Sequence, residues 1–359
     1  MKLDLEGVTT TLPYRNYYRG RNGLVAKYIA NYFGVDYVDE KEEIDKNNMN
    51  VYYVPPVTQV RGLSHLKGIN DKNDFYGLLI DKIGHVHKAI LHKTNTVNTP
   101  DFYSVNFSKI VEDLVLPGVT VFSKEGIEKA YKEIGYVSRA VRIKIPNESD
   151  GRDQFTVENQ TELRTVINKL QEEKISTEGL VLEVNLYDQN TISVGYCDLQ
   201  GERYSFLALQ KNDVAPEDGR DRYMGAKIRV VRGNISNLSA IANNRNEEIA
   251  IIKSQKFDQF YSYFNPSISR ISYDCLFGKT SKEDSLSGIT DITGRLGGTC
   301  PALIMAACEF KTHNELSKIE AEVTLNYNPQ STEIEGEKDA VRFIDLPSLR
   351  LTARINKKG

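Results

Sequence analysis

Hydrophobic and polar residues alternate in short, regular patterns along most of the chain, and these patterns predict a succession of helices and strands. Before Gly34, which ends the pattern, apolar residues recur at the spacing of one helix face. The members of this face are Leu24, Val25, Tyr28, Ile29, Tyr32 and Phe33. Residues 51–54 predict a strand that two prolines stop, and residues 75–80 form another apolar run. Residues 1 to about 105 therefore predict an α/β unit.

The next segment predicts a strand, a helix and a strand. Residues 114–118 have the pattern of a strand end, and Ser123 is placed to cap a helix that Gly135 ends. Residues 140–146 then alternate apolar and basic positions. This alternation puts the basic side chains, Lys144 among them, on one face of a strand.

A helix and several strands follow. Asn159, with Glu162 three residues later, makes a capping-box-like helix start, and residues 179–186 are typical of a buried strand. Further elements are predicted as strands at 191–197, 204–209 and 227–231, a helix through 249–264, and closing strands at 321–327 and 340–351.

Two apolar runs near residue 280 each carry a single carboxylate. Residues 271–277 contain Asp274, residues 288–293 contain Asp291, and the polar segment between them predicts a hairpin. Paired strands would bring both carboxylates to one face, where they repel each other unless a cation lies between them.

A turn of sequence Arg-Leu-Gly-Gly, Arg295 to Gly298, follows the second run and leads into an apolar helix at 301–310. Two acids on adjacent strands, followed by an arginine and a glycine turn, suggest a magnesium–phosphate site. The alternative is a surface hairpin with solvated acids.

Composition excludes several classes of protein. The 359 residues carry a formal net charge of -3 with basic residues scattered, which gives no general attraction to nucleic acid or anionic membranes. No apolar run approaches the ~18 residues that span a bilayer, and the first residues lack the apolar core of a signal peptide. The four cysteines lie far apart and are expected to be reduced thiols. We therefore expect a cytoplasmic protein without nucleic-acid or membrane partners.

Three histidines fall within eight residues at 85–92, and this density raises the question of a metal site. On a strand, His85 and His87 would share a face. No cysteine or further acid nearby has the spacing of a metal ligand set. A polar rim beside a substrate pocket, or plain surface, is the favoured interpretation, and a histidine–metal hydrolase that also uses His92 is the remote alternative.

The order of the predicted elements resembles the ATP-grasp fold. Lys144-Ile145-Pro146, followed by a loop that contains Gly151, is similar to that fold's Lys-x-Pro and phosphate loop. The strand at 180–186, with Glu183 near its end, looks like its adenine hinge.

The acid-bearing strands extend this resemblance. Asp274 stands where the fold usually has its first metal carboxylate, and Asp291-x-Thr293 stands where it usually shows Glu-x-Asn. The chain is more closely similar to an uncharacterised bacterial family of ATP-grasp-like, biotin carboxylase-like proteins over roughly residues 20–310. The matching motifs are Tyr53-Val54-Pro55, Lys88-Ala89-Ile90, Leu116-Pro117-Gly118, Phe122-Ser123, residues 179–183, Thr191-x-Ser193-Val194-Gly195, residues 230–233, Tyr273-Asp274 and Arg295-x-Gly297-Gly298.

This resemblance implies an α/β (α+β) protein whose ATP-grasp fold follows an N-terminal Rossmann-like pre-ATP-grasp domain. The implied parts are a pre-ATP-grasp domain at 1–108, a central subdomain with phosphate loop and hinge at 109–190, a C-terminal subdomain with the metal site at 191–310, and a strand extension at 311–359.

The resemblance also implies an ATP- and Mg²⁺-dependent ligase. Such an enzyme phosphorylates a small-molecule carboxylate and passes the acyl group to an amine or similar nucleophile. The implied nucleotide ligands are Lys144, Gly151, Glu183 and the backbone groups of Val184 and Leu186. The implied Mg²⁺ ligands are Asp274, Asp291 and Thr293. Arg295, with Arg232 or Arg229, would steady the transferring phosphoryl group.

Two departures from the fold's usual pattern keep other functions open. The phosphate loop has one glycine where several are usual, and Asp291-x-Thr293 replaces Glu-x-Asn. Both changes favour a weakly active or non-catalytic nucleotide-binding protein, and a small-molecule kinase on the same fold is a third hypothesis. The substrates are not encoded in any motif, and a homo-oligomer is compatible with the sequence.

Overall fold

The computed structural model describes residues 7–10, 19–38, 50–63, 69–146, 154–214, 221–327, 340–346 and 348–359. The N-terminal part contains a parallel three-stranded sheet in the order β2-β1-β3, formed by Asp36–Val38, Gly7–Thr10 and Val51–Val54. Helix α1, Arg19–Phe33, packs Val25 and Ile29 into the core beside this sheet. Gly34 ends the helix at φ 74°, a conformation that glycine adopts without steric cost. This arrangement confirms the predicted α/β start of the chain.

A small second sheet joins this part to the rest of the molecule. It has the order β14-β5-β4, formed by Ser267–Ile268, Leu78–Ile80 and Gln59–Val60. Strand β14 comes from residues just before the acid-bearing hairpin, so the sheet ties that hairpin to the N-terminal segment.

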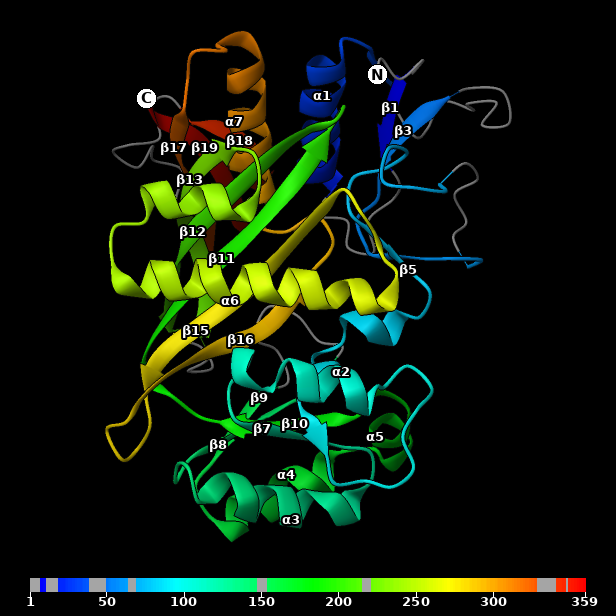
Figure 1. The fold of residues 1–359 in the computed structure, drawn as a ribbon, viewed down its shortest axis with the longest axis vertical. Coiled ribbons are helices and arrows are strands. Elements are labelled where there is room, and N and C mark those ends of the chain that lie inside the picture. Colours follow the sequence, from blue (N-terminus) through cyan, green and yellow to red (C-terminus); the bar gives the residue numbers. More distant parts are fainter. Residues whose placement is uncertain are drawn as a thin grey trace.

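A five-stranded sheet forms the lower part of the view in Figure 1. Its order is β6-β7-β10-β8-β9, formed by Lys93–Thr94, Gly118–Val121, Leu180–Val184, Val141–Lys144 and Gln154–Val157. The helices of this part are α2 (Val105–Ile110), α3 (Lys124–Gly135), α4 (Gln160–Lys169) and α5 (Glu172–Glu178). The predicted capping box is confirmed: Asn159 Oδ1 accepts from the Glu162 amide at 3.0 Å, and Glu162 reaches back to the Glu158 amide at 2.8 Å.

The largest sheet has eight strands, and the predicted hairpin forms its edge. Its order is β16-β15-β11-β12-β13-β17-β19-β18, formed by Ser285–Thr293, Arg270–Lys279, Tyr187–Leu199, Glu202–Val214, Asp221–Arg232, Lys318–Tyr327, Leu349–Lys358 and Val341–Leu346. Helix α6, Arg245–Tyr261, covers one face, and α7, Cys300–Thr312, packs on the other beside α1 (Figure 1). Strands β17, β19 and β18 extend this sheet beyond β13. The sequence analysis predicted strands in this part of the chain but not the sheet to which they belong.

Two predicted strands are wrong. Residues 85–92 form the 3₁₀ turns η2 (Ile83–Val86) and η3 (Lys88–Leu91), not a strand with histidines on one face. The segment at 114–118 does not end a strand, because the 3₁₀ turn η4 spans Glu112–Leu114 and strand β7 begins only at Gly118. Both segments are short and largely buried, and patterns this short do not distinguish a strand from a helical turn.

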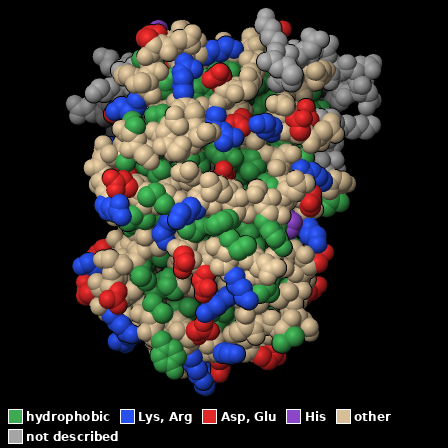
Figure 2. Space-filling model, in the orientation of Figure 1, with side chains coloured by type: hydrophobic (Ala, Val, Ile, Leu, Met, Phe, Trp, Pro, Cys, Tyr) green, Lys and Arg blue, Asp and Glu red, His purple; other side chains and the backbone are tan. Residues whose placement is uncertain are grey.

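None of the described helices combines the length and apolar character needed to cross a membrane. Acidic and basic side chains are interspersed on the face shown in Figure 2, without a large block of one sign.

Candidate active site

The two carboxylates of the hairpin face each other. Asp274 of β15 is paired directly with Asp291 of β16 in the antiparallel ladder, so both side chains lie on the same face of the sheet. The register then shifts between Asp274 and Cys275, because Ile289 rather than Thr290 pairs with Cys275. Thr290 is therefore the extra residue of a β-bulge, which re-aims its side chain. The alternating neighbours Tyr273 and Cys275 are buried on the α6 side.

The environment of Asp274 disfavours its negative charge. Burial and the charge of Asp291 raise the pKa of Asp274, and hydrogen bonds from neighbouring polar groups offset this only in part. Ser193 Oγ donates to Asp274 Oδ1 at 2.6 Å, and Gln210 Nε2 donates in turn to Ser193 Oγ at 2.8 Å. The pair of acids is thus held rigidly on one face, in a state that a cation between them would stabilise.

Lys144 crosses from the five-stranded sheet to this hairpin. Its ammonium group donates to Thr290 Oγ1 and forms a buried ion pair with Glu183 Oε1. Burial lowers the pKa of Lys144, although Glu183 acts in the opposite direction. Thr290 is the residue before Asp291, so the lysine of one sheet and the acids of the other belong to one cluster.

Glu183 is the buried anion of this cluster. Its Oε2 lies 3.4 Å from His92 Nε2, and both side chains are almost completely buried. Burial opposes ionisation of Glu183, but Lys144 and His92 outweigh that effect and lower its pKa to about 2. Glu183 therefore stays ionised and pairs with Lys144.

A second lysine approaches the acids from the 3₁₀ segment. Lys88 Nζ lies 3.3 Å from Asp291 Oδ1, and Lys88 is buried although it carries a charge. Its positive charge also contributes to the lowered pKa of Lys144. Two lysines therefore converge on the strand that carries Asp291, which is the charge arrangement that a polyphosphate requires.

Arg270 holds the turn that follows the second acid. The Arg270 guanidinium is fully buried, and its Nη1 donates to the carbonyl oxygens of Thr293 at 2.6 Å and Arg295 at 2.7 Å. Its Nη2 donates to Ser272 Oγ at 3.1 Å. The Arg295 side chain is half-buried and makes no ion pair or hydrogen bond with the residues that the structure describes. The turn is thus fixed through its backbone and presents an arginine whose charge is available.

A family model described as "Protein of unknown function (DUF3182)" matches residues 15–343, which is most of the chain. The chain belongs to this family. No curated protein matches its sequence.

Solved structures with a similar fold cover almost the whole DUF3182 chain. Biotin carboxylase from Campylobacter jejuni has a TM-score of 0.57 and 11% identity over 98% of this chain and 88% of that one. N5-carboxyaminoimidazole ribonucleotide synthetase from Thermus thermophilus has a TM-score of 0.56 and 11% identity, covering 97% and 93%. D-alanyl-alanine synthetase A from Vibrio cholerae has a TM-score of 0.51 and 13% identity, covering 87% and 95%. These neighbours are ATP-grasp proteins, and the predicted ATP-grasp fold is confirmed.

The donor set of the DUF3182 chain fits one magnesium ion. Asp274, Asp291 and Thr293 lie on one face and carry the hard oxygen atoms that Mg²⁺ prefers, and the raised pKa of Asp274 reports a repulsion that a cation would relieve. No group of three or more His, Cys, Asp or Glu side chains gathers for a metal in the described part of the chain. Magnesium commonly takes only one or two protein carboxylates and fills its other positions with phosphate and water, so two acids suffice.

Some backbone groups of the predicted hinge residues Val184 and Leu186 already form hydrogen bonds within the protein. The Val184 amide donates to the Pro117 carbonyl at 3.0 Å, and the Leu186 carbonyl accepts from Gln189 Nε2 at 2.5 Å. Gly151 and the predicted phosphate loop lie outside the described residues.

Two predicted arginines lie elsewhere. Arg232 donates to the Phe310 carbonyl and lies 5.0 Å from the centre of the Phe310 ring at the end of α7. In the sheet, the residue of β13 that is level with Asp274 is Ile228, and Arg232 lies four residues further along that strand. Arg229 is a buried structural cation paired with Glu247 of α6 at 2.5 Å. The hairpin acids, Lys144 and Glu183 are brought together, whereas Arg232 and Arg229 are not.

The three histidines have separate environments. His85 stacks on Phe264 with ring centroids 4.2 Å apart, and burial lowers its pKa. His87 packs edge-on against Phe102, and its pKa falls to about 4 because it is buried. Only His92 joins the candidate site. The sequence analysis did not predict site roles for Lys88, His92, Thr290 and Arg270. The one available signal was that Lys88 and His92 flank the apolar residues 89–91, which suggests that these polar side chains are buried with them.

Proposed function

We propose that this protein is an ATP- and Mg²⁺-dependent ligase that joins a small-molecule carboxylate to an amine or similar nucleophile through an acyl phosphate, and that it acts in the cytoplasm. The observation that carries the proposal is the contact between Lys144 of β8 and Thr290 of β16, one residue from Asp291. It supports a lysine and two carboxylates that close on one triphosphate from opposite sheets.

The side chains have distinct roles in this proposal. Lys144 and Lys88 bind phosphate oxygens, and each exchanges its present carboxylate partner, Glu183 or Asp291, for the nucleotide. Asp274, Asp291 and Thr293 hold Mg²⁺, which neutralises charge on the phosphates when bound. Arg295 stabilises the anionic acyl phosphate, with its backbone held by Arg270. Glu183, Val184 and Leu186 bind the adenine end, with Gly151 in the phosphate loop.

A nucleotide-binding protein with weak or no catalysis is the second candidate. The specific observation in its favour is that both lysines are already neutralised within the protein, Lys144 by Glu183 and Lys88 by Asp291. Nucleotide binding must break these buried ion pairs, and breaking such a pair is costly. A protein that binds ATP without turning it over would tolerate this cost more easily than a fast enzyme.

The discriminating experiment measures ADP release from ATP with Mg²⁺ against panels of carboxylates and amines. The ligase requires both partners, and omission of either one abolishes ADP release. ADP formation with a single substrate and a stable phosphorylated product would instead identify a small-molecule kinase. ATP binding without ADP release under any combination would support the binding protein. Asp274→Asn should abolish any release, whereas the exposed-acid control Asp101→Asn should retain it.

A further inference from the structure

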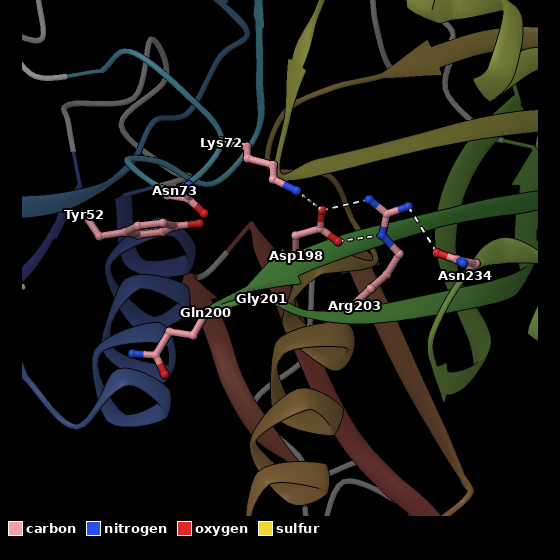
Figure 3. A pocket seen from close by; sticks show the side chains of 8 residues that line it. All are labelled: Tyr52, Lys72, Asn73, Asp198, Gln200, Gly201, Arg203 and Asn234. Carbon is pink, nitrogen blue, oxygen red and sulfur yellow. Dashed lines mark hydrogen bonds and ion pairs between the residues drawn. The ribbon is translucent and has the colours of Figure 1, made fainter. Parts of the chain in front are cut away.

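A polar hollow at the far end of the β11–β12 hairpin forms a second candidate site. It has a volume of ≈ 220 Å³ and lies where the N-terminal part meets the hairpin turn (Figure 3). Tyr52 and Lys72 approach it from the N-terminal part, and Asp198 and Arg203 approach it from the hairpin. Charged and amide side chains dominate the lining.

This hollow is separate from the candidate active site. Ser193, which bonds Asp274, and Asp198 are five residues apart on the same regular stretch of β11, so their side chains point to opposite faces of the sheet. The charged side chains Asp198 and Arg203 therefore enter the hollow from the α6 face, whereas the carboxylate pair lies on the α7 face. A ligand in the hollow would contact neither Asp274 nor Asp291.

The side chains that line the hollow carry one net positive charge. Arg203 binds Asp198 with two hydrogen bonds, from Nε at 2.6 Å and from Nη2 at 2.8 Å, and stacks 3.8 Å over the Tyr196 ring. This bidentate pair cancels the Asp198 charge. Lys72 Nζ forms a looser ion pair with Asp198 at 3.6 Å, beyond hydrogen-bond distance, and its side chain is half-exposed. Arg203 already neutralises that carboxylate. The Lys72 charge is therefore available to a ligand.

The remaining hydrogen-bonding capacity consists mainly of donors. The side-chain oxygens of Asn234 and Gln200 already accept, from Arg203 at 3.5 Å and Lys311 at 3.4 Å. Tyr52 is 1% exposed, and its hydroxyl makes no well-formed hydrogen bond with the described residues, although the Ser269 side chain lies near it. Figure 3 shows this hydroxyl pointing into the hollow. A buried hydroxyl without a partner is costly, and a ligand acceptor would remove that cost.

We propose that this hollow binds a small oxyanion, through a carboxylate or phosphate group that accepts from the Lys72 ammonium and the Tyr52 hydroxyl. Such a ligand bridges the N-terminal part and the hairpin turn of the largest sheet. The site is independent of the proposed ligase chemistry.

The test measures binding of inorganic phosphate and, separately, of succinate to the full chain by calorimetry at low ionic strength. At least one of them binds to the wild type, and the better one identifies the group. Lys72→Gln weakens this binding roughly tenfold or more, as expected for a lost charged hydrogen bond. Tyr52→Phe, which removes only the hydroxyl, weakens it severalfold. Lys82→Gln, an exposed lysine paired with Asp101 elsewhere, leaves it unchanged.

Lys144→Met distinguishes anion binding in the hollow from anion binding at the candidate nucleotide site. It should leave the oxyanion affinity of the hollow unaltered. The proposal is overturned if neither anion binds, or if the affinity depends on Lys144 and not on Lys72 and Tyr52. Circular dichroism verifies the fold of each variant. If Lys72→Gln does not fold, Tyr52→Phe decides the outcome, because it removes a single oxygen atom and keeps the ring packing.

Discussion

Asp274 and Asp291 are paired directly across β15 and β16, with both carboxylates on one face. Burial and this like charge raise the pKa of Asp274. A raised carboxyl pKa in the folded state means that the native protein binds more protons than the unfolded chain between the two pKa values. The stability contributed by Asp274 therefore falls as pH rises through that window, and without a metal the ionised pair is destabilising at neutral pH.

The first prediction concerns Asp274→Asn. Because the amide keeps an oxygen that accepts from Ser193 and removes the repulsion, the metal-free variant should melt about 1–3 °C above the wild type at pH 7.5. The difference should shrink as pH is lowered, since Asp274 of the wild type then becomes neutral. Calorimetric melting between pH 4.5 and 8 measures this. A variant less stable than the wild type throughout that range would contradict the raised pKa of Asp274.

The second prediction concerns the buried pair Lys144–Glu183. Lys144→Met leaves the buried Glu183 carboxylate without its lysine partner and should lower the free energy of unfolding by roughly 3–5 kcal/mol. The double variant Lys144→Met/Glu183→Gln removes both charges and should recover much of that loss. A double-mutant cycle in urea gives the coupling free energy. Additive losses would mean that the two residues do not interact as the structure indicates.

The third prediction is a pH dependence from Glu183. Its pKa is lowered to about 2, so the stability it contributes is fully present above the ordinary pKa of 4.5 and is lost as pH falls toward 2. The wild type should lose stability steeply in this window, and the Lys144→Met/Glu183→Gln variant less steeply. Urea midpoints at half-unit pH steps provide the comparison, and parallel curves would be evidence against the lowered pKa.

The fourth prediction concerns Arg270 as the residue that positions the Arg295 turn. Arg270→Met removes hydrogen bonds to the carbonyls of Thr293 and Arg295, so amide hydrogen exchange at residues 294–298 should accelerate at least tenfold. Global stability should fall by about 2–4 kcal/mol. Arg245→Met, at an exposed ion pair at the start of α6, serves as the control and should alter neither quantity appreciably. Unchanged exchange in the turn of Arg270→Met would show that Arg270 does not hold it.

Local patterns in the sequence predicted the hairpin, the capping box at Asn159 and the strand that carries Lys144, because each depends on neighbours within a few residues. Contacts between distant segments were not predictable in this way. Thr290 faces Lys144 because a bulge re-aims it, and nothing in an alternating pattern marks the bulged position.

The segment at 85–92 was misassigned because its charged residues were assumed to be exposed. Lys88 and His92 are buried by ion pairs with Asp291 and Glu183, which lie about 90 to 200 residues away in the sequence. Arg232 was expected at the site from its place in a motif, but its side chain is bound to the end of α7. The pairing register between neighbouring strands decides which residues lie beside Asp274, and a short sequence motif does not determine that register.

The central claim is that Lys144 and the pair Asp274–Asp291 bind the same magnesium–ATP complex. Thermal unfolding with ATP tests this claim most directly. At ~100 times its Kd, a ligand adds roughly 2.7 kcal/mol of stability. We expect stabilisation of the wild type that requires Mg²⁺ together with ATP, persists in Lys82→Gln, and is largely lost in Asp274→Asn and Lys144→Ala. Equal stabilisation of the wild type and both site variants, or none with any of them, would contradict the account.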